Sequence, residues 1–233
     1  FEDPMGDAMN INLYSDEELK KFSISISKIE RWLKKRDIEY ILVIAPNKHT
    51  IYSEFLPDYI KKHNNMSATD QLVSYLHKHT SINVVDLRQP LLDMKHKQTL
   101  YYKTDTHWNS YGANIAQYEI MKKVNSLFSL PVDARLLEEN EFNTSKTLSN
   151  GDLAGYAKLD NLSEVDPFPI FKDKCDVTSI PKTYKYNETH IKLCKDKWLK
   201  ALIFRDSFFI ALEPYFDNYF AKATYIWEKS SYS

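Results

Sequence analysis

The chain has 233 residues, of which 43% are apolar and 27% charged, the balance of an ordinary globular protein that can bury a core. Its 31 basic and 32 acidic side chains nearly cancel, which argues against a nucleic-acid binder. No segment approaches the roughly 20 consecutive apolar residues of a membrane-spanning helix, and residues 1–4 lack the basic and apolar regions of a signal peptide. The abrupt start, and an end at 225–228 that reads as a strand just begun, predict a chain trimmed from a longer protein.

The first part of the chain predicts a helix followed by a buried strand. Ser15 and Glu18 form a capping box, and apolar residues then recur at helical spacing, which predicts a helix over 16–36. The basic run at 34–36 ends it. A continuous apolar run with β-branched residues over 39–45, stopped by Pro46, predicts a strand buried on both faces.

Helices and strands go on alternating further along the chain. The patterns predict a helix, a strand, a helix, a strand and a helix, in that order, at 68–78, 82–87, 109–128, 201–204 and 207–216. The segment 131–199 is polar and broken by prolines, so we expect irregular structure there, with room for a hairpin around 175–194. This alternation predicts an α/β fold, a three-layer α/β/α arrangement with a mostly parallel central sheet. We expect one domain over 1–233, with 131–199 as an insertion.

Two compositional features leave alternatives open. Cys175 and Cys194 are the only cysteines; they form a disulfide if the protein lies outside the cytoplasm, or remain two buried thiols. They lack the close pairing typical of zinc sites, so a cysteine-based metal site is not expected. The 16 Tyr, 12 Phe and 4 Trp stand against only 4 Gly, a density common on carbohydrate-binding surfaces and equally compatible with a tyrosine-rich core.

Ser207 lies at the turn between the strand predicted at 201–204 and the helix that follows. In an open parallel sheet, functional groups collect at the carboxyl ends of the strands. The free N–H groups at a helix N-terminus would stabilise an oxyanion at this point. A serine is also a routine helix N-cap, so taken alone this position favours capping over catalysis.

Asp105 and His107 lie two residues apart in a polar segment just before the helix predicted at 109–128. On extended backbone this spacing points both side chains the same way, so the segment can present a base with its orienting carboxylate, or two metal ligands. The metal interpretation lacks partners, and a solvated loop histidine is the remaining alternative. The other histidines are scattered along the chain at His49, His63, His77, His79, His96 and His190.

Together, Ser207, His107 and Asp105 are the residue types of a Ser-His-Asp acyl-transfer site, which is defined by geometry and not by chain order. Residues 104–113 (TDTHWNSYGA) resemble the Asp-x-His-Trp-Asn…Gly-Ala signature of the AlgX and AlgJ family of SGNH-like proteins. Asp-x-His precedes the serine in that family, the reverse of the usual SGNH order, and it does so here.

The resemblance spans most of the chain. Residues 206–208, with 214–216 and Phe220, resemble the family's Gly-Asp-Ser-Phe nucleophile block, and the strand at 41–46 and the Gly-Asp-Leu at 151–153 also match. The chain departs from the family at Arg205, where a Gly usually precedes Asp-Ser. The turn must therefore use a backbone conformation open to a non-glycine residue.

The resemblance implies an SGNH hydrolase-like fold with permuted motif order, and O-acetylation of a bacterial cell-surface or exported polysaccharide such as alginate. In that mechanism His107 takes the proton of Ser207, Asp105 holds the imidazole tautomer, and an acetyl group passes through Ser207 to a sugar hydroxyl. No cofactor is expected. The candidates for oxyanion or substrate binding, on position alone, are Asn47, Asn109, Trp108, Tyr111 and Arg205, and Tyr101 and Tyr102 are further candidates for the sugar site.

The resemblance also implies an extracytoplasmic location, in the periplasm or on the outer cell surface, with a membrane tether in the full-length protein. The partners implied are a polysaccharide acceptor and a membrane acyltransferase that supplies acetyl groups. Two other functions stay open at this point. One is a carbohydrate acetyl-esterase, which uses the same three residues, and the other is a catalytically idle carbohydrate-binding subunit of a polysaccharide export complex.

Overall fold

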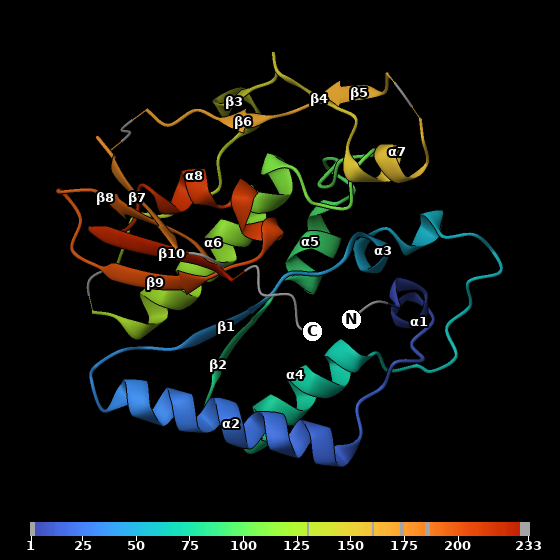
Figure 1. The fold of residues 1–233 in the computed structure, drawn as a ribbon, viewed down its shortest axis with the longest axis horizontal. Helices are drawn as coiled ribbons and strands as arrows, with labels where there is room; N and C mark the ends of the chain where they lie inside the picture. The colour runs from blue at the N-terminus through green and yellow to red at the C-terminus, as the bar shows by residue number, and fades with distance from the viewer. Residues whose placement is uncertain (1–2, 130, 160, 173–174, 185–186, 229–233) are drawn as a thin grey trace. The chain divides into compact units, whose positions relative to one another are not determined.

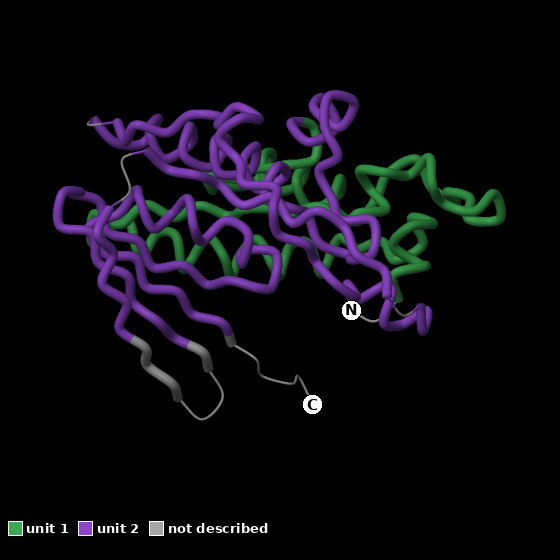
Figure 2. Tube along the Cα trace, turned by 90° about the horizontal axis from the view of Figure 1, so that it is seen from above, with its two compact units in different colours: residues 1–89 green, residues 90–233 purple. Residues whose placement is uncertain are grey.

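The computed structural model describes residues 3–129, 131–159, 161–172, 175–184 and 187–228. The chain divides into two compact units, residues 1–89 and residues 90–233, which Figure 2 colours separately. Both units combine helices with strands, which confirms the α/β class. Among the described residues, no helix is long and apolar enough to cross a membrane.

Unit 1 is built on two parallel strands, β1 (Ile41–Ile44) and β2 (Asn83–Asp86). Helices α2 (Asp16–Lys34) and α4 (Ala68–His79) contribute Ile26 and Leu76 to the apolar cluster that covers these strands (Figure 1). The unit also contains α1 (Pro4–Ala8), α3 (Lys48–Ile51) and the 3-10 turn η1 (Ser53–Phe55), and α5 (Arg88–Met94) crosses the division between the units.

The predicted first helix is confirmed, with a small change at its end. Ser15 Oγ accepts the Glu18 N–H at 3.3 Å, and the Glu18 carboxylate accepts the Ser15 N–H at 2.8 Å, so the capping box is formed. The helix ends at Lys34 because Asp37, with a φ of 55°, turns the chain into the left-handed region. The strand predicted at 39–45 is shorter than expected and half-buried, since β2 alone pairs with it among the described strands.

Unit 2 contains a mixed four-stranded sheet. In spatial order its strands are β7 (Thr178–Tyr184), β8 (Asn187–Leu193), β10 (Lys222–Glu228) and β9 (Lys200–Phe204). Strands β9 and β10 run parallel, whereas β8 runs antiparallel to both β7 and β10. A mostly parallel central sheet is therefore not confirmed, because the hairpin of β7 and β8 adds antiparallel strands beside β10.

The segment 131–199 holds more regular structure than expected. The hairpin predicted around 175–194 is confirmed, and Cys175 and Cys194 are joined by a disulfide. The remaining strand pairs are two or three residues long, too short to produce a visible periodicity in the sequence. They are β3 (Phe142–Asn143) with β6 (Phe168–Pro169) and β4 (Thr147–Ser149) with β5 (Ser163–Val165), accompanied by η2 (Glu139–Glu141) and α7 (Asp152–Tyr156).

The helix predicted over 207–216 is wrong as a single element. It is divided into the 3-10 turn η3 (Ser207–Ala211) and the short helix α8 (Glu213–Phe216). Pro214 explains the break, because its nitrogen has no hydrogen to donate and its ring obstructs the preceding turn of an α-helix.

Helix α6 (Ser110–Leu127) is hydrogen-bonded to the segment that begins with α8. The Tyr215 hydroxyl donates to the Ser110 carbonyl at 2.8 Å, and the Tyr219 hydroxyl donates to the Gln117 side-chain oxygen at 2.6 Å. Tyr215 and Gln117 are fully buried. The helix that follows His107 is thus held against the helix that follows Ser207.

Candidate active site

Ser207, His107 and Asp105 form one chain of hydrogen bonds in unit 2. The Nε2 atom of His107 lies 2.8 Å from Ser207 Oγ, and its Nδ1 atom lies 2.6 Å from Asp105 Oδ1. With the ring proton on Nδ1, the imidazole donates to Asp105 and accepts the Ser207 O–H. Both distances are within the hydrogen-bond reach that nucleophile, base and orienting acid require.

The turn at Ser207 leaves its hydroxyl available for this contact. Asp206 caps η3, because its Oδ1 accepts the Phe208 N–H at 3.0 Å, so the interpretation of Ser207 as a simple N-cap is wrong. The Ser207 N–H makes no hydrogen bond within the described part of the chain. Arg205 is not among the residues with positive φ, so the turn does not require a glycine at that position.

Asp105 is bound from two sides. Its Oδ1 accepts the backbone N–H of His107 at 2.9 Å in addition to the imidazole, and its Oδ2 accepts the backbone N–H of Asp152 at 3.0 Å. Burial alone would raise the pKa of Asp105, but the two N–H donors and the His107 imidazole lower it below its ordinary value. Asp105 is therefore ionised at neutral pH and able to hold the Nδ1 proton of His107.

Asp152, at the start of α7, is a residue of this site that the sequence interpretation missed. Its carboxylate accepts the Thr106 N–H at 2.7 Å and the Thr106 hydroxyl, and it lies 3.8 Å from His107 Nδ1. Thr106 lies 46 positions away from Asp152 in the chain, so no local sequence pattern indicates that the two residues are in contact. The only indication in the sequence was the Gly-Asp-Leu at 151–153, which matches the family but does not show what Asp152 does.

Gly151 allows this approach because there is no space for a side chain beside it. A Cβ at this position would lie 2.5 Å from the Thr104 carbonyl oxygen and 2.8 Å from the Cβ of Asp105. Both distances are shorter than real Cβ contacts, so any larger residue would push α7 away from the loop that carries Asp105 and His107.

The same loop is held at two more points by carboxylates. Glu164 on β5 accepts the backbone N–H groups of Lys103 and Thr104 at 2.7 and 2.8 Å. Asp166 accepts the Tyr102 hydroxyl at 2.5 Å, and burial together with this carboxylate raises the pKa of the Tyr102 phenol. Three carboxylates, those of Asp152, Glu164 and Asp166, therefore hold the loop in its conformation.

Trp108 and Asn109, predicted as candidates for oxyanion or substrate binding, make structural contacts, and their predicted roles stay predictions. Trp108 is 1% exposed, its indole N–H donates to the Phe208 carbonyl at 2.8 Å, and the two rings meet edge to face. Asn109 caps α6 by accepting the Tyr111 N–H at 2.9 Å, and its amide donates to the Thr99 carbonyl at 2.8 Å. Trp108 thus links the histidine segment directly to the serine segment.

The other candidates are placed as follows. The Tyr111 ring packs against Phe142 with centroids 4.6 Å apart, and Tyr101 is 1% exposed. The Arg205 guanidinium lies over the Trp227 ring at 4.2 Å, and its Nε is buried without a hydrogen-bond partner among the described residues. Asn47 belongs to unit 1, where it precedes α3, so its predicted oxyanion role stays a prediction.

Asp105, His107 and Asp152 also present three potential metal-ligand atoms within 4.8 Å of one another. Hydrogen bonds already account for these groups. The Nδ1 proton is shared with Asp105, and each carboxylate accepts backbone N–H groups. The hydrogen bonds of the imidazole and the two carboxylates are therefore satisfied by protein groups, without a cation.

Comparison with known protein families points to one of them. The family described as an SGNH hydrolase-like domain, acetyltransferase AlgX, matches residues 7–186, a range that includes Asp105, His107 and Asp152 and ends before Ser207. A protein of Pseudomonas putida named "Probable alginate O-acetylase AlgJ" is 27% identical over 171 residues, which cover 67% of this chain and 43% of that protein. The chain thus spans less than half the length of this relative.

Solved structures share the fold. PatB1 of Bacillus cereus, determined with a sulfonyl adduct, superposes with a TM-score of 0.66 at 17% identity, covering 90% of this chain and 78% of that one. The O-acetyltransferase domain of Pseudomonas putida AlgJ gives a TM-score of 0.52 at 18% identity, covering 90% of this chain and 72% of that one. These likenesses support the SGNH hydrolase-like fold.

Proposed function

The chain belongs to the AlgX family of SGNH hydrolase-like acetyltransferase domains, and we propose that it transfers acetyl groups to a polysaccharide through an acyl-enzyme on Ser207. The observation that carries the proposal is the continuous chain of hydrogen bonds, with 2.8 Å from Ser207 Oγ to His107 Nε2 and 2.6 Å from His107 Nδ1 to Asp105. Relatives named as alginate O-acetylases support the choice of acetyl as the group transferred.

The proposed reaction is a double displacement. Ser207 Oγ attacks the carbonyl carbon of the acetyl donor while His107 Nε2 takes its proton, and the imidazolium then gives that proton to the leaving group. A sugar hydroxyl next attacks the acetyl-serine, again losing its proton to His107, and Ser207 regains a proton when the ester bond breaks. Ionised Asp105 stabilises the imidazolium in both halves.

Two features support stabilisation of the developing oxyanion near Ser207. The Ser207 N–H has no partner within the described part of the chain, and it lies in the first turn of η3, where N–H groups are not used by the helix. We assign this N–H as one oxyanion donor. A second donor is expected from elsewhere in the site, and Asn47 stays a candidate for it.

A carbohydrate acetyl-esterase would use the same three residues, with water in place of the sugar hydroxyl. Family membership favours transfer. A catalytically idle carbohydrate-binding subunit is less consistent with the ionised Asp105 and the aligned imidazole, because binding alone requires neither. The Cys175–Cys194 disulfide supports an oxidising, extracytoplasmic location, and a membrane tether and a membrane acyltransferase that supplies acetyl groups stay predictions.

The test offers an activated acetyl ester, p-nitrophenyl acetate, to the 233-residue chain with and without oligosaccharide acceptors. The proposal predicts that acetylated oligosaccharide appears in the mass spectrum for wild type and not for Ser207→Ala. Release of acetate without any acetylated sugar, across acceptors that include oligomannuronate, would favour the esterase. Equal p-nitrophenol release by wild type and Ser207→Ala would contradict both enzyme functions.

A further inference from the structure

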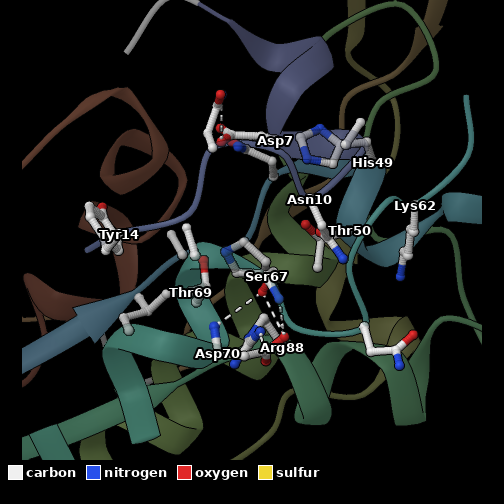
Figure 3. A pocket seen from close by; sticks show the side chains of 18 of the residues that line it. Asp7, Asn10, Tyr14, His49, Thr50, Lys62, Ser67, Thr69, Asp70 and Arg88 are labelled. Carbon is white, nitrogen blue, oxygen red and sulfur yellow. Dashed lines mark hydrogen bonds and ion pairs between the residues drawn. The ribbon is translucent and has the colours of Figure 1, made fainter. Parts of the chain in front are cut away.

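A second site-like feature lies in unit 1. A cavity of about 290 Å³ is bordered by the residues that follow β1 and β2, where Ile44 leads into Asn47 and Asp86 leads into Arg88. The carboxyl ends of parallel strands are where open α/β folds bind their ligands. Figure 3 shows the side chains around the cavity, with Asp7 and His49 across from Ser67, Asp70 and Arg88.

The charged side chains around the cavity are balanced in number, and Arg88 is already paired. The Arg88 guanidinium binds Asp70 at 2.6 Å and Asp86 at 2.6 Å, so its donors are committed to two carboxylates. The lining contains two carboxylates, Asp7 and Asp70, and two cations, Lys62 and Arg88. The lining therefore carries no net charge that would favour a charged ligand of either sign.

Two further groups argue against an anion. The N-terminus of α4 is occupied by its own capping box, in which Ser67 Oγ accepts the Asp70 N–H at 3.1 Å and the Asp70 carboxylate accepts the Ser67 N–H at 2.9 Å. Burial lowers the pKa of His49, with the nearby Lys62 acting in the same direction and Asp7 opposing both. His49 is then uncharged at neutral pH, so neither the helix end nor the imidazole offers positive charge.

The neutral polar side chains of the cavity, in contrast, have unused hydrogen-bonding capacity. Asn47, Thr50, Asn65 and Thr69 make no side-chain hydrogen bond within the described part of the chain. Amides and hydroxyls both donate and accept, and so do the hydroxyl groups of a sugar. The volume is at the lower end of ligand pockets, which suits one ring and not a longer segment.

We propose that this cavity of unit 1 is a binding site for an uncharged, polyhydroxylated ligand, namely a single neutral sugar unit. The hydroxyls of the sugar would form hydrogen bonds with the free side chains of Asn47, Thr50 and Thr69, while the ion pairs of Arg88 stay undisturbed. The proposal goes beyond the acyl chemistry of Ser207 and does not depend on it, so either can fail while the other holds.

The test compares two probes that differ in one group, methyl β-galactopyranoside and methyl β-galactopyranosiduronate, together with methyl β-glucopyranoside and inorganic phosphate. Each is titrated into the isotopically labelled chain, and backbone amide signals are followed by NMR. We expect at least one uncharged glycoside, at millimolar concentration, to shift the signals of residues 47–50 and 67–70. The galacturonoside and phosphate are expected to leave them unchanged.

A double variant tests the contacts. Asn47→Ala with Thr50→Val removes two free polar groups and is expected to weaken glycoside binding at least about tenfold, since each hydrogen bond contributes severalfold in affinity. The control double variant is Asn140→Ala with Thr144→Val, which removes the same kinds of group at two exposed positions of unit 2. It is expected to leave the affinity for the glycoside unchanged. If the double variant does not fold, the titrations of the wild-type chain still test whether the cavity binds an uncharged glycoside. The proposal is overturned if no uncharged glycoside shifts these signals, or if the galacturonoside or phosphate does so at lower concentration.

Discussion

Ser207 Oγ lies 2.8 Å from Nε2 of His107, although the two residues are 100 positions apart in the chain. A second link joins the same two segments, the hydrogen bond from the Trp108 indole to the Phe208 carbonyl at 2.8 Å. The two contacts are made by adjacent residues, since Trp108 follows His107 and Phe208 follows Ser207. The nucleophile and base are therefore positioned by a short, doubly connected interface within unit 2.

Ser207→Ala and the adjacent Asp206→Ala are predicted to separate catalysis from capping. Ser207→Ala removes the nucleophile and should lower kcat for acetyl transfer by about 10⁴-fold or more, with little effect on the free energy of unfolding. Asp206→Ala removes the cap of η3 and should cost about 1 kcal/mol of stability. Ester turnover and urea denaturation on both variants check this. A stability loss at Ser207→Ala larger than that at Asp206→Ala would contradict the assignment.

Asp105→Asn is predicted to lower kcat by about 10⁴-fold, because the amide cannot hold the Nδ1–H tautomer or stabilise the imidazolium. Its effect on stability should depend on pH. The folded pKa of Asp105 is lowered, so the ionised group stabilises the fold above the pKa of an unfolded aspartate, about 3.9, and this contribution is lost as the pH falls through the folded pKa. Urea denaturation between neutral pH and about pH 3 should show the difference between wild type and Asp105→Asn shrinking on acidification. A difference that stays constant over this range would contradict the ionised Asp105.

Gly151→Ala and Gly155→Ala are a matched pair in and beside α7. At Gly151 a methyl group would meet the Thr104 carbonyl oxygen at 2.5 Å, so we expect a loss of about 1–3 kcal/mol in stability and a marked fall in kcat. At Gly155 nothing lies within 4 Å, and the helical position predicts a neutral change or a gain of up to about 1 kcal/mol. Thermal denaturation and ester turnover measure both. Equal effects of the two substitutions on stability and kcat would contradict the close approach of Gly151 to the Thr104 carbonyl.

Asp152→Asn tests a positioning residue. Asp152 holds the Thr106 backbone and hydroxyl, so its loss should let the His107 loop shift and lower kcat by about 10- to 100-fold with KM for the ester little changed. Asp196→Asn, an exposed aspartate in the same unit, is the control. An altered melting temperature with an unchanged kcat would reduce Asp152 to a structural role.

The sequence allowed the three central residues to be chosen because each carries a local signal. Asp105 and His107 stand in one short polar segment, and Ser207 follows an apolar strand, as the structure has it in β9. The capping box of Ser15 and Glu18 is local too, and it is formed. Signals of this kind depend on neighbours within a few positions, which is why they could be read without a structure.

The parts that were missed depend on contacts between distant positions. Asp152 acquires its role only where α7 meets Thr106, and β8 joins β10 through residues far along the chain. The division of the helix at 207–216 was visible in principle, since Pro214 forbids a continuous helix, but the apolar spacing across it suggested one element. The capping contacts of Asn109 and the packing of Trp108 likewise involve partners that only the folded chain supplies.

The most direct test of the account is the identity of the residue that becomes acetylated. The chain is mixed with p-nitrophenyl acetate, stopped with acid after a short interval, weighed intact and then digested for peptide mapping. The account predicts one acetyl group, on Ser207, which is absent from Ser207→Ala and forms far more slowly in His107→Ala. An acetyl group on any other residue in wild type, or an equal adduct in Ser207→Ala, would contradict the central role of Ser207.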